Sequence, residues 1–333
     1  MKITILGAGA MGCLIGGRMV AAGHPVTFVA RGAQLAALQQ SGLTLESPNE
    51  RWQGPVSATG DTASLGAQDT VILTCKANQL EGMMPLLAPL LGPDTMVVPA
   101  VNGLPWWYFQ NHGGEFDGRR LESLDPTGAI AAAIAPHHIV GCVNYLAGTL
   151  IRPGYVHYVP ELERRLALGE IDGTTSARVE RLAAMLGDAG FAPVVTPNIR
   201  EPMWHKLWGN IAFNPISALT HGTIDQLAED YNDIDLLTSV MNEARNIADK
   251  LGITLAQTTK SRVAAAAKMR GHKTSMLVDL EQGRACEIEA IVGAVREIGK
   301  WMEESTPYLN ALYSLVKLKA QFYRASVSGD THT

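Results

Sequence analysis

Short apolar runs alternate with longer helical stretches over roughly the first two hundred residues. The runs are continuous and rich in β-branched residues, as in strands that are covered on both faces of a parallel sheet. They predict strands at Ile3–Leu6, Val26–Ala30, Thr70–Thr74, Met96–Val101, Ile139–Tyr145, Tyr155–Val159 and Arg165–Gly169. The stretches between them predict helices that include Met11–Ala22 and Thr175–Ala189. This part of the chain is therefore expected to be an α/β domain.

The pattern changes near Thr196-Pro197-Asn198. From there on, apolar residues recur at helical spacing, which predicts helices at 199–219, 233–251, 254–270, 287–304 and 307–324. Pro215 has no N–H for the carbonyl of Ile211, so the first of these helices is expected to bend or end there. We expect residues 1–197 to form the α/β domain and residues 198–333 to form an all-helical domain.

The composition indicates a folded protein with small partners. Hydrophobic residues make up 47% of the chain and charged residues 18%, which allows a sizeable core. The formal net charge of -5 argues against binding nucleic acid through a basic surface. We find no signal-peptide pattern and no apolar run of about 18 residues, so we expect a cytoplasmic protein without a membrane partner. The four cysteines are scattered without metal-ligand spacing, and no metal is expected.

A glycine motif, Gly7-Ala8-Gly9-Ala10-Met11-Gly12, lies between the first predicted strand and the first predicted helix. In that position a GxGxxG sequence makes a tight turn, lets a diphosphate approach the backbone and packs the helix on the strand. The helix N-terminus then offers N–H groups to the diphosphate. A glycine-rich turn without a ligand is the alternative. The motif favours a Rossmann-type dinucleotide-binding domain.

The end of the second predicted strand bears on the choice of dinucleotide. An NAD site usually has Asp or Glu there for the ribose 2′-hydroxyl, but this strand ends Val29-Ala30-Arg31. Arg31 can instead make a charge-assisted fork on a 2′-phosphate, although a solvated arginine is the alternative. The absent acid and the arginine together predict NADPH.

Two polar residues follow later strands, at the edge where such sheets bind ligands. Lys76 comes after the strand at 70–74, and Asn102 comes after the strand at 96–101. Both are expected to face the nicotinamide half of the cofactor, with ordinary loop residues as the alternative.

Lys206, Asn210 and Asn214 form the most distinctive chemical pattern of the helical part. Steps of four residues place them within an arc of about 80° on one helix face. Apolar residues flank this row and few other charges lie on the helix, so burying these groups requires polar partners, unless the row simply faces solvent. Reducing a keto group needs a hydride at carbon and a proton at oxygen, and a partly desolvated lysine can supply that proton.

Together these residues resemble the ketopantoate reductase family (2-dehydropantoate 2-reductase). The segments that carry the resemblance span nearly the whole chain: KITILGAGAMG at the start, Arg31, TCKA at 74–77, VNG at 101–103, WHKLWGNIAFNPISAL at 204–219, TSMLVDLEQGRACEIE at 274–289 and TPYLNALYSLVK at 306–317. The resemblance implies a helical domain similar to the C-terminal domain of 6-phosphogluconate dehydrogenase. It also implies reduction of 2-dehydropantoate to pantoate with NADPH, a step towards pantothenate and coenzyme A.

The resemblance assigns roles residue by residue. The cofactor-binding residues it implies are Gly7, Ala8, Gly9, Ala10, Met11, Gly12 and Arg31, with Lys76, Asn102 and Ala147 nearer the nicotinamide and Glu287 on the cofactor side. Lys206 becomes the catalytic acid, and the substrate would be bound by Asn210, Asn214 and Ser275.

The chain departs from the family's pattern at three places. A further substrate-binding Asn is absent from Leu219–Ile224, His272 stands where the family can have Asn, and Trp106-Trp107-Tyr108 is expected to bring aromatic rings to the substrate opening. Two alternatives therefore stay open: reduction of a different 2-keto acid, and a non-catalytic NADPH-binding sensor. The last predicted helix or the whole helical domain could also supply a homodimer surface.

Overall fold

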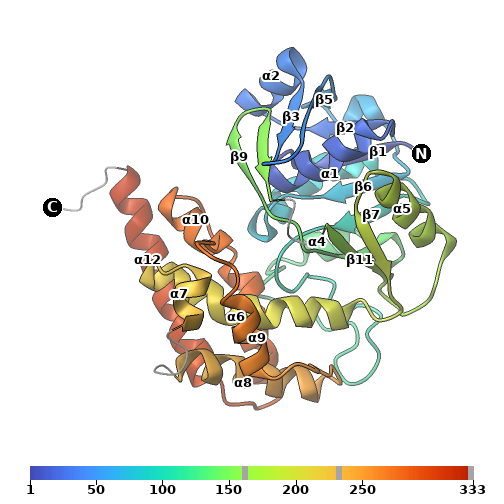
Figure 1. The fold of residues 1–333 in the computed structure, drawn as a ribbon. Coiled ribbons are helices and arrows are strands. Elements are labelled where there is room, and N and C mark those ends of the chain that lie inside the picture. Colours follow the sequence, from blue (N-terminus) through green and yellow to red (C-terminus); the bar gives the residue numbers. More distant parts are fainter. Residues whose placement is uncertain (160–163, 230–234, 329–333) are drawn as a thin grey trace. The chain divides into compact units, whose positions relative to one another are not determined.

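The computed structural model describes residues 1–159, 164–229 and 235–328, and the chain forms two units (Figure 1). The first unit contains Met1–Val101, Trp106–Arg120 and Thr127–Ile199. The second unit contains the chain from Arg200 onward and two short segments, Asn102–Pro105 and Leu121–Pro126. The expected boundary between residues 197 and 198 stays a prediction, and the two short segments were not predicted.

A five-stranded parallel sheet, in the order β5-β2-β1-β6-β7, is the centre of the first unit. Its strands are β1 (Ile3–Leu6), β2 (Val26–Val29), β5 (Ser57–Thr59), β6 (Thr70–Leu73) and β7 (Met96–Pro99). Every residue of β1, β6 and β7 is buried, as strands covered on both faces require. The helices of this unit are α1 (Ala10–Ala21), α2 (Gly32–Ser41), α3 (Leu80–Leu87), α4 (Ala129–Ala133) and α5 (Ala177–Asp188). The predicted Rossmann-type α/β fold is confirmed.

The remaining strands do not extend this sheet. They form two smaller sheets: β4 (Arg51–Gly54), β3 (Leu43–Glu46), β10 (Tyr155–Tyr158) and β9 (Gly148–Arg152) in one, and β12 (Ala192–Val195), β11 (Arg165–Glu170) and β8 (Val140–Asn144) in the other. The pairs β9–β10 and β8–β11 are antiparallel. Only Pro153 and Gly154 connect β9 to β10, and so short a link allows only an antiparallel hairpin. The expected parallel sheet is confirmed, and the expected strands at 139–145, 155–159 and 165–169 exist but belong to the two smaller sheets.

The aromatic run after residue 105 is buried. The exposed fractions are 3% for Trp106, 1% for Trp107 and 0% for Tyr108. Trp107 packs so closely on Gly141 of β8 that a Cβ atom there would lie 3.0 Å from its ring. These rings are buried in the hydrophobic core, whereas they were expected to lie at the substrate opening.

The second unit is helical, which confirms the predicted class of the C-terminal part. Its elements are α6 (Arg200–Thr220), α7 (Ile224–Glu229), α8 (Leu236–Lys250), α9 (Thr259–Ala266), α10 (Ser275–Glu281), a π-helical turn at Glu289–Gly293, α11 (Ala294–Trp301) and α12 (Pro307–Ser328). The predicted helix at 254–270 is shorter in the structure, and α7 and α10 were not predicted. The side-chain pattern of α10 is too short to show a helical period.

Helix α6 continues past Pro215 to Thr220, so of the two expected outcomes the helix does not end at the proline, and a bend there stays a prediction. A proline inside a helix costs about 3 kcal/mol, whereas each large apolar side chain that is buried contributes roughly 1.5–3 kcal/mol. All residues from 211 to 218 are buried, so packing outweighs the missing hydrogen bond. In the described part of the chain no helix is long and apolar enough to cross a membrane.

Candidate active site

The glycine motif forms a close turn between β1 and α1. Gly7 has a φ of +112°, and a Cβ atom there would lie 2.7 Å from the backbone nitrogen of Cys75. A Cβ atom on Gly12 would collide with the carbonyl oxygen of Gly7. Thr74 at the end of β6 donates its hydroxyl to that same carbonyl, at 2.6 Å. These contacts explain the glycines at both ends of the motif.

Gly9, in the middle of the motif, faces open space. No atom lies within 4 Å of a Cβ position on Gly9, which is the N-cap residue of α1. Among the described residues no side chain caps this helix N-terminus, and its first turn carries no acidic residue. The backbone N–H groups of Ala10 and Met11 are thus placed as an anion site requires. The turn, with Ala8 held by a 2.9 Å hydrogen bond from Gln34, fits a dinucleotide diphosphate.

Arg31 is exposed at the N-cap of α2, two residues after β2. The first turn of α2 contains no acidic residue that would compete for its guanidinium. This position fits a 2′-phosphate, because a guanidinium group at the exposed N-terminus of α2 matches the negative charge and the oxygen geometry of a phosphate.

Two further predicted cofactor residues lie in the same unit. Lys76 is half-buried and begins a short 3-10 turn after β6, where its N–H donates to Gln79 at 3.3 Å. Ala147 is half-buried in the β8–β9 connection, and its neighbour Gly148 lies against the Met11 side chain. Both residues thus flank the turn that holds the glycine motif, and their roles stay predictions.

The central polar contact of the second unit joins three predicted residues. The Lys206 ammonium group donates to Oδ1 of Asn102 at 2.7 Å, and Asn102 Nδ2 lies 3.5 Å from Glu287 Oε2. Lys206 is half-buried on α6, and Glu287 is only 8% exposed. The amide therefore connects a cation to a buried carboxylate. The segment Asn102–Pro105 belongs to the helical unit, which is why this contact forms there.

The remaining candidate substrate residues are placed on two helices that pack together, α6 and α10. Asn210 is half-buried, Asn214 is 5% exposed, and Ser275 is exposed as the first residue of α10. The side chain of Thr274 caps α10 by accepting the N–H of Leu277 at 3.2 Å. The solvent-facing alternative for the row on α6 does not hold for Asn214.

Arg262 of α9 was missed by sequence reasoning. Its guanidinium packs on Gly209 of α6, where a Cβ atom would lie 2.7 Å from Nη2. Gly209 is three residues after Lys206, so a second cation lies beside the polar row. The glycine inside a helix was the available signal, because an interior glycine costs about 1 kcal/mol and often permits a close approach.

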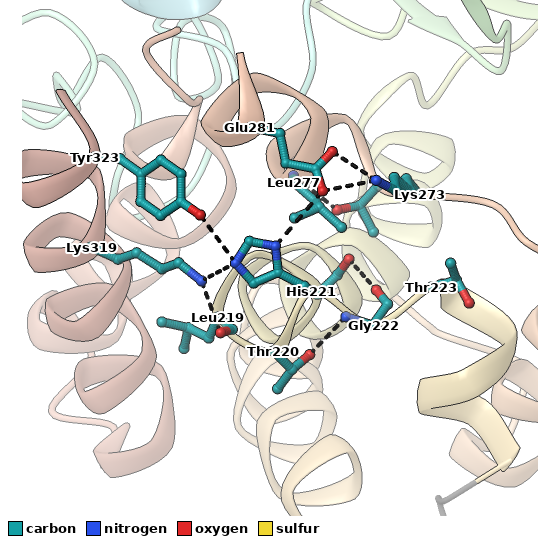
Figure 2. Close-up of polar contacts among 12 residues, drawn as sticks. Leu219, Thr220, His221, Gly222, Thr223, Lys273, Leu277, Glu281, Lys319 and Tyr323 are labelled. Carbon is teal, nitrogen blue, oxygen red and sulfur yellow. Dashed lines mark hydrogen bonds and ion pairs between the residues drawn. The ribbon is translucent and has the colours of Figure 1, made fainter. Parts of the chain in front are cut away.

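The segment that lacks the expected asparagine carries His221 instead (Figure 2). This residue directly follows Thr220, the last residue of α6, and has a φ of +61°. Its Nε2 accepts a hydrogen bond from Lys319 at 2.9 Å, and its Nδ1 lies 3.7 Å from Glu281. Lys273 donates to both Glu281 oxygens at 2.8 Å and holds the pKa of that carboxyl below its usual value. His221 therefore ties the end of α6 to α10 and α12.

In the described residues no three His, Cys, Asp or Glu side chains gather as metal ligands would.

Comparison with known proteins matches both units to one family. The model described as "Ketopantoate reductase PanE/ApbA" matches residues 3–106, and its C-terminal counterpart matches residues 198–320. A 2-dehydropantoate 2-reductase from Mesorhizobium japonicum is 42% identical over 318 residues, covering 95% of this chain and 97% of that protein. The chain belongs to the ketopantoate reductase family. The predicted family and the predicted enzyme class, an oxidoreductase, are confirmed.

Solved structures of ketopantoate reductases agree in fold. A protein from Ralstonia solanacearum MolK2 described as a ketopantoate reductase superposes with a TM-score of 0.91 at 41% identity, covering 96% of this chain and 98% of that one. A 2-dehydropantoate 2-reductase from Geobacter metallireducens gives a TM-score of 0.83 at 26% identity, over 96% and 99% of the two chains.

Proposed function

We propose that this ketopantoate reductase reduces 2-dehydropantoate to pantoate with NADPH. The observation that carries the proposal is the Lys206–Asn102 contact of 2.7 Å, which holds an ammonium group in a fixed, half-buried position. The names of the similar reductases give the substrate.

NADPH, when bound, supplies the hydride that attacks the keto carbon. Lys206 gives its proton to the oxygen on which negative charge develops, so that the keto group becomes a hydroxyl. Asn102 accepts a hydrogen bond from one N–H of the ammonium group and thereby orients the other two N–H groups. Glu287 holds the amide of Asn102 in the required orientation, and solvent returns a proton to Lys206 afterwards.

The substrate residues follow from chemistry and placement. A 2-keto acid presents a carboxylate and a keto oxygen, both of which accept hydrogen bonds. Asn210 and Asn214 offer amide donors on the same face as Lys206, and Ser275 offers an exposed hydroxyl on α10, which packs against α6. For the cofactor, Arg31 supports NADPH over NADH.

The direct test is NADPH oxidation, followed by its absorbance, with 2-dehydropantoate and a panel of other 2-keto acids. Fast turnover with 2-dehydropantoate and little with the others supports the proposal. Turnover with another keto acid alone would keep the mechanism and change the substrate. NADPH binding without any turnover would leave the sensor alternative.

We further propose a homodimer formed through α12. Tyr308, Leu315, Leu318 and Phe322 on this helix are 45%, 50%, 49% and 71% exposed. With Ala311 they follow the alternating three- and four-residue spacing of a coiled-coil seam, and such an exposed stripe favours a partner helix. Leu318→Glu should convert a dimer to a monomer in sedimentation, and a monomeric unmodified protein would refute the proposal.

A cytoplasmic location is also part of the proposal. The four cysteines, all in the described part of the chain, form no disulfide, in keeping with a reducing compartment. Cell fractionation tests it.

A further inference from the structure

The segment that carries Asn102 is anchored to a π-helical turn. The turn spans Glu289–Gly293 and begins two residues after Glu287. Such turns contain one more residue than α-helical geometry needs, and they occur often at functional sites. Here the carbonyl of Ala290 accepts the N–H of Leu104 from outside the helix, at 2.8 Å. The turn thus holds the backbone two residues after Asn102.

Gly103 makes this approach possible. Its φ is +79°, and a Cβ atom would collide with the carbonyl oxygen of Ala290 and lie 2.7 Å from the Ala290 side chain. The position of Asn102 is therefore fixed by direct contact between the backbones at Gly103 and Ala290. A shift of the turn must move both Asn102 and Glu287, the two groups that connect to Lys206.

A cluster on α12 fixes the first residue of the turn. The Tyr313 hydroxyl lies 2.8 Å and 3.0 Å from the two carboxylate oxygens of Glu289, and Lys317 donates to one of them at 2.9 Å. The carboxylate lies over Gly293, where a Cβ atom would collide with it. A hydrogen bond with Tyr313, and then one with Glu289, raise the pKa of Lys317, so Lys317 stays positively charged beside the Glu289 carboxylate.

The same tyrosine also contacts the helix that follows the turn. The guanidinium of Arg296 on α11 stacks over the Tyr313 ring at 4.0 Å, and its Nε donates to Asn310 of α12 at 2.6 Å. Tyr313 therefore contacts Glu289, the first residue of the π-helical turn, through its hydroxyl, and Arg296, three residues after the turn, through its ring.

We infer that Glu289 and Tyr313 are positioning residues for the reduction: they hold the π-helical turn in the register that places Asn102 and Glu287 around Lys206. The inference rests on the proposed role of Lys206. Neither residue touches the reacting atoms, so both act through Asn102. A misplacement of about 1 Å far from the chemistry can lower a rate roughly a hundredfold, which sets the scale of the effect.

The experiment compares Tyr313→Phe, Glu289→Gln and Glu289→Ala with the control Ser314→Ala, all in the full-length protein. Ser314 is an exposed neighbour whose hydroxyl donates to the backbone carbonyl of Asn310 in its own helix at 2.9 Å. Turnover number, KM for each substrate and the pH profile of turnover are measured. Hydrogen exchange of the peptide containing residues 102–105 is followed by mass spectrometry as a readout independent of activity.

We expect Tyr313→Phe and Glu289→Ala to lower the turnover number about 10- to 100-fold. The pH profile should shift, and the Leu104 amide should exchange faster. Glu289→Gln keeps an acceptor for Tyr313 and should recover part of the rate. Unchanged turnover and pH profile in folded Tyr313→Phe and Glu289→Gln, or unchanged exchange at 102–105, would overturn the inference. An unmodified protein that reduces no keto acid would instead refute the proposed function, while the exchange data would still test the anchoring.

Discussion

The contact between Lys206 and Asn102 gives the sharpest quantitative expectation. Asn102→Leu keeps the approximate size of the side chain and removes both polar atoms. The lost interaction is a hydrogen bond of 2.7 Å from a charged donor, in a half-buried place. Hydrogen bonds to charged groups are worth about 1.5–3 kcal/mol. At about 1.4 kcal/mol per factor of ten, kcat/KM should fall roughly 10- to 150-fold.

Asn102→Asp tests the same contact by replacing the neutral amide with a negatively charged carboxylate. The new carboxylate would lie beside Lys206 and about 3.5 Å from Glu287. Attraction to the carboxylate should raise the pKa of the lysine and weaken it as an acid, while two adjacent carboxylates should raise the pKa of one of them. The variant should therefore be active over a different pH range than the unmodified enzyme.

The assay is kcat/KM for 2-dehydropantoate from acid to alkaline pH for all three proteins, with circular dichroism as the control for folding. All three proteins should give the same spectrum. An Asn102→Leu enzyme within twofold of the unmodified one, or an Asn102→Asp enzyme with an unshifted profile, would refute the reasoning.

Three other expectations concern the cofactor, His221 and α12. Arg31→Ala should raise the KM for NADPH about 10- to 150-fold and leave NADH use unchanged, since one charged hydrogen-bonding group is lost; equal losses for both would remove Arg31 from the phosphate site. His221→Ala should lower the melting temperature more than His221→Asn, because Asn tolerates the positive φ of +61°, and calorimetry that ranks them the other way would contradict this. Burial raises the pKa of Glu243, whose carboxylate caps α12 by accepting two backbone N–H groups. Its folded-state pKa lies above the unfolded value, so the unfolding free energy should fall as pH rises from the ordinary carboxyl pKa through the raised one. Urea titrations of Glu243→Gln at several pH values should lack this fall. The same dependence of unfolding free energy on pH in both proteins would contradict the assignment.

Local patterns predicted the central sheet well. The runs at 3–6, 26–30, 70–74 and 96–101 are short, apolar and bounded by polar residues, and the structure shows a strand in each. The strands of the two smaller sheets are less apolar, and their partners are distant in sequence: β10 pairs with β3, more than 100 residues earlier. Nothing in the sequence of either strand specifies that pairing.

The candidate site was predictable to a similar degree. The row on α6 follows from helical spacing, and the glycine motif from its place between strand and helix. The contact of Asn102 with Lys206 could not be predicted, because it depends on a short segment joining the helical unit. The π-helical turn was also invisible, since a helix with one extra residue looks in sequence like an ordinary helix.

The π-helical turn has a consequence for how this enzyme could change over evolution. Because the turn holds one residue beyond α-helical need, losing a single residue within 289–293 could be absorbed without unfolding α11. Everything before the deletion would then rotate by about 100° and move by about 1.5 Å relative to α11. Glu287 would turn away from Asn102, while α11 and α12 would keep their packing. One deletion at this place could thus alter the chemistry of the enzyme and leave its scaffold intact.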